Sequence, residues 1–199
     1  MKTIKIYIDE AGRWPWAWPV VVSGVVIKDP KLDLSIYDDS KILKPLVRER
    51  LYKKIVWLSS SHCLYYHNTY TSACTIDKYG IVHALYRCID RIAHYFSSLF
   101  GKKFKYKLII DGNRTFWLEK KRDVETIIHG DAICKPIGMA SIIAKVTRDA
   151  AMIRYDKRYP HHGFAKHKWY GTKHHADMIL KYGITPIHRI SYLKNILQK

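Results

Sequence analysis

The sequence predicts an α/β fold in which a mixed sheet is flanked by helices. Five short runs are rich in apolar and β-branched residues, which is typical of buried strands. Three longer stretches repeat apolar residues with the spacing of an α-helix. Three of the strands fall within the first seventy residues, and helices and strands alternate after them, an order that favours a mixed sheet.

The predicted strands comprise residues 4–8, 20–27, 63–70, 107–110 and 124–128. The Asp29-Pro30 step ends the second strand, because proline restricts the residue before it and removes a backbone donor. The predicted long helices comprise residues 45–58, 81–100 and 137–159. Pro45 suits a first helical turn, and Pro160 and Gly163 end the third helix. Two short helices are expected at 172–181 and 192–197.

The composition indicates a globular, strongly basic protein. Hydrophobic residues make up 48% of the 199 residues, which argues against extensive disorder. Lysine and arginine number 35 against 17 acidic residues, a formal net charge of +18. Such a balance favours a polyanionic partner, most simply a nucleic acid, although a generally basic proteome or an association with ribosomes would also explain it.

The cysteines and the N-terminus predict a cytoplasmic protein that does not associate with membranes. The four cysteines show neither CxxC spacing nor histidines at zinc-finger intervals, so reduced and mostly buried thiols are expected at Cys63, Cys74, Cys88 and Cys134. The N-terminal segment lacks the long apolar region of a signal peptide. No run of about 18 apolar residues is present anywhere.

Four acidic residues in three short segments suggest a metal site. Asp9 and Glu10 follow the first strand, Asp111 follows the fourth, and Asp131 lies in IIHGDA. Carboxylates at the end of a buried strand are costly unless a cation meets them. Mg²⁺ and Mn²⁺ prefer oxygen ligands and leave positions open for substrate phosphate. Helix capping or surface ion pairing would explain any one of these acids, but less readily all four.

These segments resemble ribonuclease HII, a family that cuts the RNA strand of RNA–DNA hybrids and nicks DNA at embedded ribonucleotides. Each matching string is weak alone, but their order and spacing together are highly specific. The strings are IDEAGR at 8–13, DDSKIL at 38–43, IIDGN at 109–113, GDA at 130–132, ASIIAKVTRD at 140–149, HKWYGTKHH at 167–175 and PIHRISY at 186–192.

The resemblance implies an RNase H-like five-stranded mixed sheet with a small helical C-terminal extension. Residues 1–160 would form the catalytic domain, and residues 161–199 an extension of it that recognises substrate. Asp9, Glu10, Asp111 and Asp131 would bind two Mg²⁺ or Mn²⁺ ions, and the products would carry a 5′-phosphate and a 3′-hydroxyl. The partners implied are RNA–DNA hybrids and ribonucleotide-containing duplex DNA, bound by a monomer.

The resemblance also assigns substrate contacts. In the family, a Gly-Arg-Gly loop reads the ribose 2′-hydroxyl through backbone groups, and here that loop is Gly12-Arg13-Trp14. Tyr170 corresponds to a tyrosine that packs on the sugar beyond the ribonucleotide. Further expected contacts, each equally explained as solvated surface, are Lys41, Lys166, Lys168, Lys173 and Thr172.

For several other residues, a structural role is the better explanation. His161, His162, His174 and His175 lack interspersed acids or cysteines, so we expect phosphate-proximal or solvent-facing groups and no metal site. Ser141 is expected to pack or cap within a helix, and Asp149 to form a salt bridge. His188 and Arg189 match the C-terminal string of the family and are expected to be structural anchors.

Three tryptophans depart from the family pattern. Positions 14, 18 and 169 hold Trp where the family has Gly, and the chain has six Trp but only 10 Gly. Our hypothesis is that some or all were glycine in a source organism that reads UGA as Gly, although Trp16 matches the family's own Trp. If Trp14 is genuine, it should obstruct the recognition loop, and the alternative function is a catalytically impaired nucleic-acid-binding homologue. A junction-resolving DNA nuclease is a weaker alternative.

Overall fold

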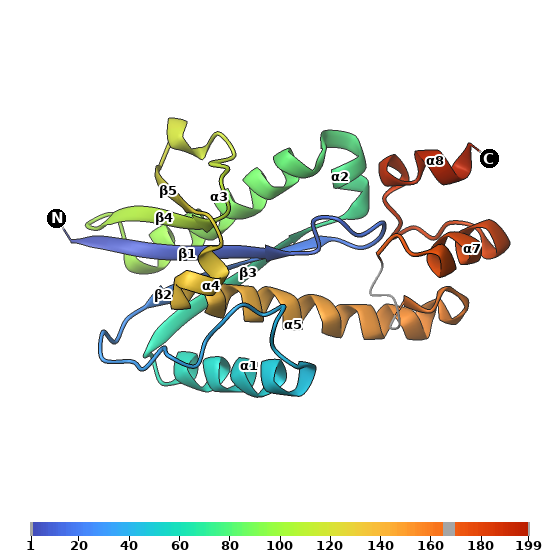
Figure 1. Cartoon of the computed structure of the whole chain (residues 1–199). Helices are drawn as coiled ribbons and strands as arrows, with labels where there is room; N and C mark the ends of the chain where they lie inside the picture. Colours follow the sequence, from blue (N-terminus) through green and yellow to red (C-terminus); the bar gives the residue numbers. More distant parts are fainter. Residues whose placement is uncertain (1, 165–169, 199) are drawn as a thin grey trace.

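A five-stranded mixed sheet forms the centre of the molecule (Figure 1). The computed structural model describes residues 2–164 and 170–198. The strands lie in the order β3-β2-β1-β4-β5. β2 is antiparallel to β1 and β3, whereas β4 is parallel to β1 and β5. The bounds are β1 Thr3–Ala11, β2 Val20–Ile27, β3 Leu64–Thr71, β4 Lys105–Asp111 and β5 Asp123–Ile127.

Helices cover both faces of this sheet (Figure 1). One face is covered by α3 (Ile81–Phe100), which follows the short α2 (Ala73–Tyr79). The other face is covered by α1 (Pro45–Ser60) and α5 (Lys135–Arg158). The predicted mixed α/β sheet with flanking helices is therefore confirmed.

Two apolar clusters hold the helices to the sheet. The stripe of α3 that contains Leu85, Ile89 and Ile92 packs against Ile6 and Ile8 of β1, and all five are at most 1% exposed. A second cluster joins α1 and α5 to the opposite face through residues such as Ile55, Leu64 and Ile143. Burying a side chain of this size contributes about 1.5–3 kcal/mol, so these clusters stabilise the packing of the helices on the sheet.

The main differences from the predicted elements lie near the acidic residues. β1 continues through Asp9 and Glu10, because these residues still pair with Ser23 and Val22 of β2. The helices α2 and α4 (Gly130–Ile133) were not predicted, since elements of seven and four residues are too short to show periodicity. Ser72 accepts a hydrogen bond from Thr75 N–H at 3.1 Å, a cap that marks the start of α2.

The C-terminal segment returns to the loop that follows β1. The helices α7 (Lys173–Tyr182) and α8 (Lys194–Leu197) lie beyond the end of the sheet (Figure 1). Between them, Ile187 O accepts a hydrogen bond from Trp18 N–H, and Arg189 N–H donates to Trp16 O, both at 2.7 Å. Ala17 forms an isolated bridge with His188. Short 3₁₀ turns occupy Leu118–Lys120, Pro160–His162 and Ile190–Tyr192.

Three further findings bear on the sequence-based expectations. The four cysteines are free thiols, but the expectation that most are buried is wrong, because only Cys88 is buried and Cys74 is exposed. Within the described ranges, no helix combines the length and apolarity needed to cross a bilayer. Trp18 and Trp117 adopt left-handed backbone conformations, with φ of +76° and +62°, where glycine is favoured. Trp14, in contrast, is not among the residues with positive φ, and Trp169 lies outside the described residues, so of positions 14 and 18 the backbone favours glycine only at Trp18.

Candidate active site

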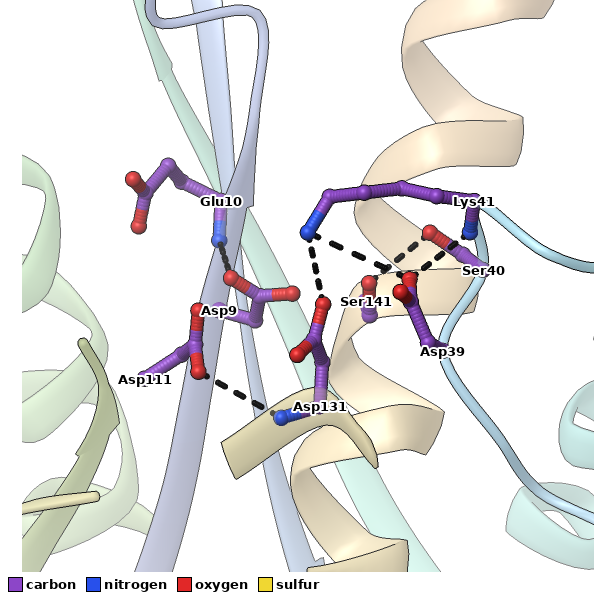
Figure 2. Close-up of polar contacts among 8 residues, drawn as sticks. All are labelled: Asp9, Glu10, Asp39, Ser40, Lys41, Asp111, Asp131 and Ser141. Carbon is purple, nitrogen blue, oxygen red and sulfur yellow. Dashed lines mark hydrogen bonds and ion pairs between the residues drawn. The ribbon is translucent and has the colours of Figure 1, made fainter. Parts of the chain in front are cut away.

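Three carboxylates from different elements converge at one end of β1. Asp9 lies in β1 and Asp111 ends the adjacent parallel strand β4, where Ile8 pairs with Ile110. Asp131 is in the first turn of α4. One oxygen from each of the three lies within 4.8 Å of the others, and the close-up shows their side chains pointing toward one another (Figure 2). We call these three residues the carboxylate trio.

Glu10 lies beside this trio. Neighbouring residues in a strand face opposite sides of the sheet, and Figure 2 shows Glu10 directed away from Asp9. Its carboxylate lies 3.6 Å from the Arg13 guanidinium. The structure thus brings three of the four predicted acids together and leaves the fourth next to them.

Burial makes negative charge costly at this site. Burial, followed by the neighbouring charges of Glu10 and Asp111, raises the pKa of Asp9 well above its ordinary value. Burial also raises the pKa of Glu10 to about 7, although Arg13 opposes the change. The pKa of Asp111 is raised by burial and then by Asp131. A divalent cation would relieve these costs, so the carboxylate trio fits an oxygen-coordinated Mg²⁺ or Mn²⁺.

Local hydrogen bonds hold the carboxylates in place. Asp9 accepts a bond from the Glu10 N–H at 2.7 Å, and Asp111 accepts one from the Asp131 N–H at 3.3 Å. The buried Ser40 and Ser141 hydroxyls are 2.8 Å apart, and a hydrogen bond from Ser141 lowers the pKa of Asp9. Ser141 is therefore a supporting hydroxyl, in agreement with the packing role predicted for it.

A cavity beside the trio contains the predicted recognition residues. It is lined by Gly12, Arg13, Trp14, Lys41 and Tyr170 together with Asp9, Glu10 and Asp111. Trp14 lines this cavity while remaining 72% exposed, so its indole lies largely in solvent. Thr172 is absent from the lining, because its hydroxyl caps α7 by accepting the His175 N–H at 3.2 Å.

Two cationic side chains in this cavity were not predicted from the sequence. Lys145 and the buried Arg148 of α5 also line the wall. With Ser141 they recur at helical spacing along one face of α5, a signal present in ASIIAKVTRD. Gly12 has φ +95°, and a Cβ there would overlap the Arg148 side chain, so only glycine allows this approach.

The structure bears on several other expectations. Asp149 forms the predicted salt bridge, at 2.7 Å from Lys145. The histidines contribute to no metal-type cluster within the described residues. However, the expectation that all four face solvent or phosphate is wrong for His162 and His175, which are 5% and 0% exposed. Lys173 is exposed, and Lys166 and Lys168 lie outside the described residues.

His175 belongs to a buried chain of hydrogen bonds. Thr185 N–H donates to His188 Nδ1 at 2.8 Å, so His188 carries its proton on Nε2. That Nε2 lies 3.1 Å from His175 Nε2, which must accept. His175 Nδ1 then donates to the Tyr170 carbonyl at 3.0 Å. Two neutral histidines thereby hold the backbone of Tyr170 at the cavity, a role the sequence did not reveal.

Comparison with known proteins agrees with this geometry. A family model described as Ribonuclease HII matches residues 6–195. A Ribonuclease HII of Clostridioides difficile is 41% identical over 191 residues, covering 96% of this chain and 70% of that protein. A Ribonuclease HII of Francisella tularensis is 38% identical over 186 residues, covering 93% and 92%.

Solved structures share the fold. The ribonuclease H2 of Pyrococcus horikoshii has a TM-score of 0.74 at 23% identity, covering 98% of this chain and 97% of that one. The ribonuclease HII in a complex with PCNA from Archaeoglobus fulgidus has a TM-score of 0.71 at 22% identity, with 94% of both chains covered.

Proposed function

Because the chain belongs to the ribonuclease HII family, a family of metal-dependent endoribonucleases, we propose that it nicks duplex DNA 5′ to embedded ribonucleotides as well as cutting RNA in RNA–DNA hybrids. The observation that carries this proposal is the carboxylate trio next to a cavity lined by the 12–14 loop and Tyr170. Residues 1–160 would carry the catalytic groups, and residues 161–199 would contribute to substrate recognition.

The carboxylates would hold the metal ions. Asp9, Asp111 and Asp131 provide closely spaced oxygens, with Asp9 and Asp131 buried and Asp111 partly buried, and Glu10 adds a fourth carboxylate at the margin. A bound pair of Mg²⁺ or Mn²⁺ ions would supply an activated water and stabilise the leaving 3′ oxygen. The deprotonated trio is needed to bind them, so metal affinity should rise as these acids lose their protons.

The remaining residues would orient the nucleic acid. Arg13, Lys41, Lys145 and Arg148 place positive charge along the cavity, where substrate phosphates would lie. The backbone of Gly12 and Arg13 would meet the 2′-hydroxyl, and the Tyr170 ring would pack on the adjoining sugar. No observation favours a catalytically silent binder, since a pure binder gains nothing from buried acids that face phosphate.

The test is a nicking assay on duplex DNA that carries a single ribonucleotide, with Mg²⁺, Mn²⁺ or chelator. Wild type should nick 5′ to the ribonucleotide only with metal, and Asp111→Asn should reduce the rate at least about 1000-fold, equivalent to about 4 kcal/mol. Asp90→Asn, which removes an acid on α3 paired with Arg122, is the matched control and should retain the rate. Metal-independent nicking, or an active Asp111→Asn, would overturn the proposal.

A further inference from the structure

Arg189 connects the C-terminal segment to the loop after β1. Its side chain is 0% exposed. Its guanidinium donates to Gly12 O at 2.6 Å, to Arg13 O at 2.9 Å, and to Trp18 O at 2.7 and 3.0 Å. Among the described residues it forms no ion pair, so its charge is met chiefly by these three carbonyl oxygens.

Such an arrangement requires arginine. The guanidinium is planar and presents five donors in a fixed fork, whereas a lysine ammonium is a compact point charge on a flexible stem. Burial, with the nearby charge of Arg148, lowers the pKa of Arg189 to about 10, so it stays charged near neutrality. Hydrogen bonds from a charged donor are about twice as strong as neutral ones, which helps to offset the cost of burial.

The contact with two consecutive carbonyls has a geometric consequence. In a planar trans peptide, the C=O of one residue and the N–H of the next point in opposite directions. Since the Gly12 and Arg13 carbonyls face Arg189, the N–H groups of Arg13 and Trp14 face away from it. Neither N–H donates a hydrogen bond to another described residue. Successive free N–H groups of this kind favour an anionic or hydroxyl oxygen.

We infer that Arg189 is a positioning residue for substrate recognition, a role that rests on the proposed function. It orients the 12–13 and 13–14 peptide groups so that two backbone donors remain available beside the cavity that Gly12, Arg13 and Trp14 line. Tyr192 supports the same arrangement, because its hydroxyl donates to Arg13 O at 3.2 Å and its ring lies 5.2 Å from the Arg189 guanidinium carbon. Arg189 and Tyr192 therefore act on ribonucleotide recognition through the backbone of the 12–14 loop, without touching the substrate.

The experiment compares binding of two duplexes of one sequence, with and without a single ribonucleotide, in Ca²⁺ so that cleavage does not interfere. For wild type, the ratio of the two Kd values measures recognition of the ribonucleotide. Arg189→Lys should reduce this ratio at least fivefold and raise KM more than it lowers kcat in Mn²⁺. Mn²⁺ affinity without nucleic acid should stay within twofold, because the carboxylates are untouched.

Arg48→Lys is the matched control. Arg48 is 6% exposed and donates to Leu43 O at 3.3 Å, on α1 and away from the loop. It should lower the melting temperature without changing the Kd ratio. If Arg189→Lys fails to fold, Tyr192→Phe provides a milder change at the same contacts. This variant should lower the Kd ratio about twofold.

The outcomes separate the two proposals. A wild type that neither nicks nor prefers the ribonucleotide overturns the proposed function itself. If wild type does both and Arg189→Lys leaves the Kd ratio unchanged, the role of Arg189 is overturned. If Arg189→Lys does not fold, an unchanged ratio in Tyr192→Phe has the same meaning. Faster hydrogen exchange confined to residues 12–18 in the folded variant would support that role.

Discussion

The Lys41 ammonium donates a hydrogen bond to the Asp131 carboxylate, with Nζ and Oδ2 2.7 Å apart, although the Lys41 side chain is 71% exposed (Figure 2). Partial burial lowers the pKa of Lys41, but the bond and the charge of Asp131 outweigh it, so the pKa is raised. Lys41 therefore offsets part of the negative charge of the trio and competes with any cation for Asp131.

Lys41→Ala should bind Mn²⁺ about two- to fivefold more tightly in the absence of nucleic acid, because exposed ion pairs contribute up to about 1 kcal/mol. Titration of free Mn²⁺ by electron paramagnetic resonance measures this. Lys135→Ala removes a comparable pair, 3.2 Å from Asp38, whose acid lies outside the trio. Equal effects of both substitutions would show that general charge, and not the Asp131 contact, is responsible.

Glu10 should make stability depend on pH when no metal is present. Its pKa rises from 4.5 to about 7 on folding, so the folded state favours the protonated acid. That contribution is fully present below pH 4.5 and is lost as pH rises through 7. Relative to Glu10→Gln, wild type should therefore lose about 3 kcal/mol of unfolding free energy between pH 4.5 and 7. Urea denaturation with chelator measures the difference, and a constant difference would contradict the assignment.

His175→Phe should destabilise the protein by about 1–3 kcal/mol, because it leaves the buried His188 Nε2–H and the Tyr170 carbonyl without their partner. Displacement of Tyr170 should also raise KM for ribonucleotide-containing duplex. His161→Phe is a suitable control, since His161 is exposed and stacks on Tyr182. Thermal melts and steady-state kinetics check both effects, and an unchanged KM would exclude the coupling to Tyr170.

Trp117→Gly should stabilise the protein by about 1 kcal/mol, because Trp117 is 56% exposed and has φ +62°, where a side chain is strained. Trp57→Gly should destabilise the protein by about 1 kcal/mol, because Trp57 is 64% exposed within the regular helix α1, where glycine is unfavourable. Chemical denaturation compares the two. Destabilisation by both variants would show that the left-handed backbone at Trp117 carries no penalty.

A left-handed backbone is also found at Trp18 but not at Trp14, so only Trp18 of these two positions has a conformation that favours glycine. Trp18 has φ +76° and packs its ring 3.8 Å from that of Tyr155. Peptide mass spectrometry of the protein from its source organism decides the matter, since tryptophan at positions 14, 18 and 169 would refute recoding.

The sequence alone determined the sheet, the long helices and the identities of the acids. These features depend on local periodicity and on residue chemistry, which a linear pattern records, as the apolar stripe of α3 illustrates. Only the tertiary structure showed that Glu10 faces away from Asp9, that Lys41 pairs with Asp131, and that Arg189 meets the carbonyls of residues 12, 13 and 18. Contacts between residues as many as 179 positions apart depend on how the packed layers bring chain segments together, which no local pattern encodes.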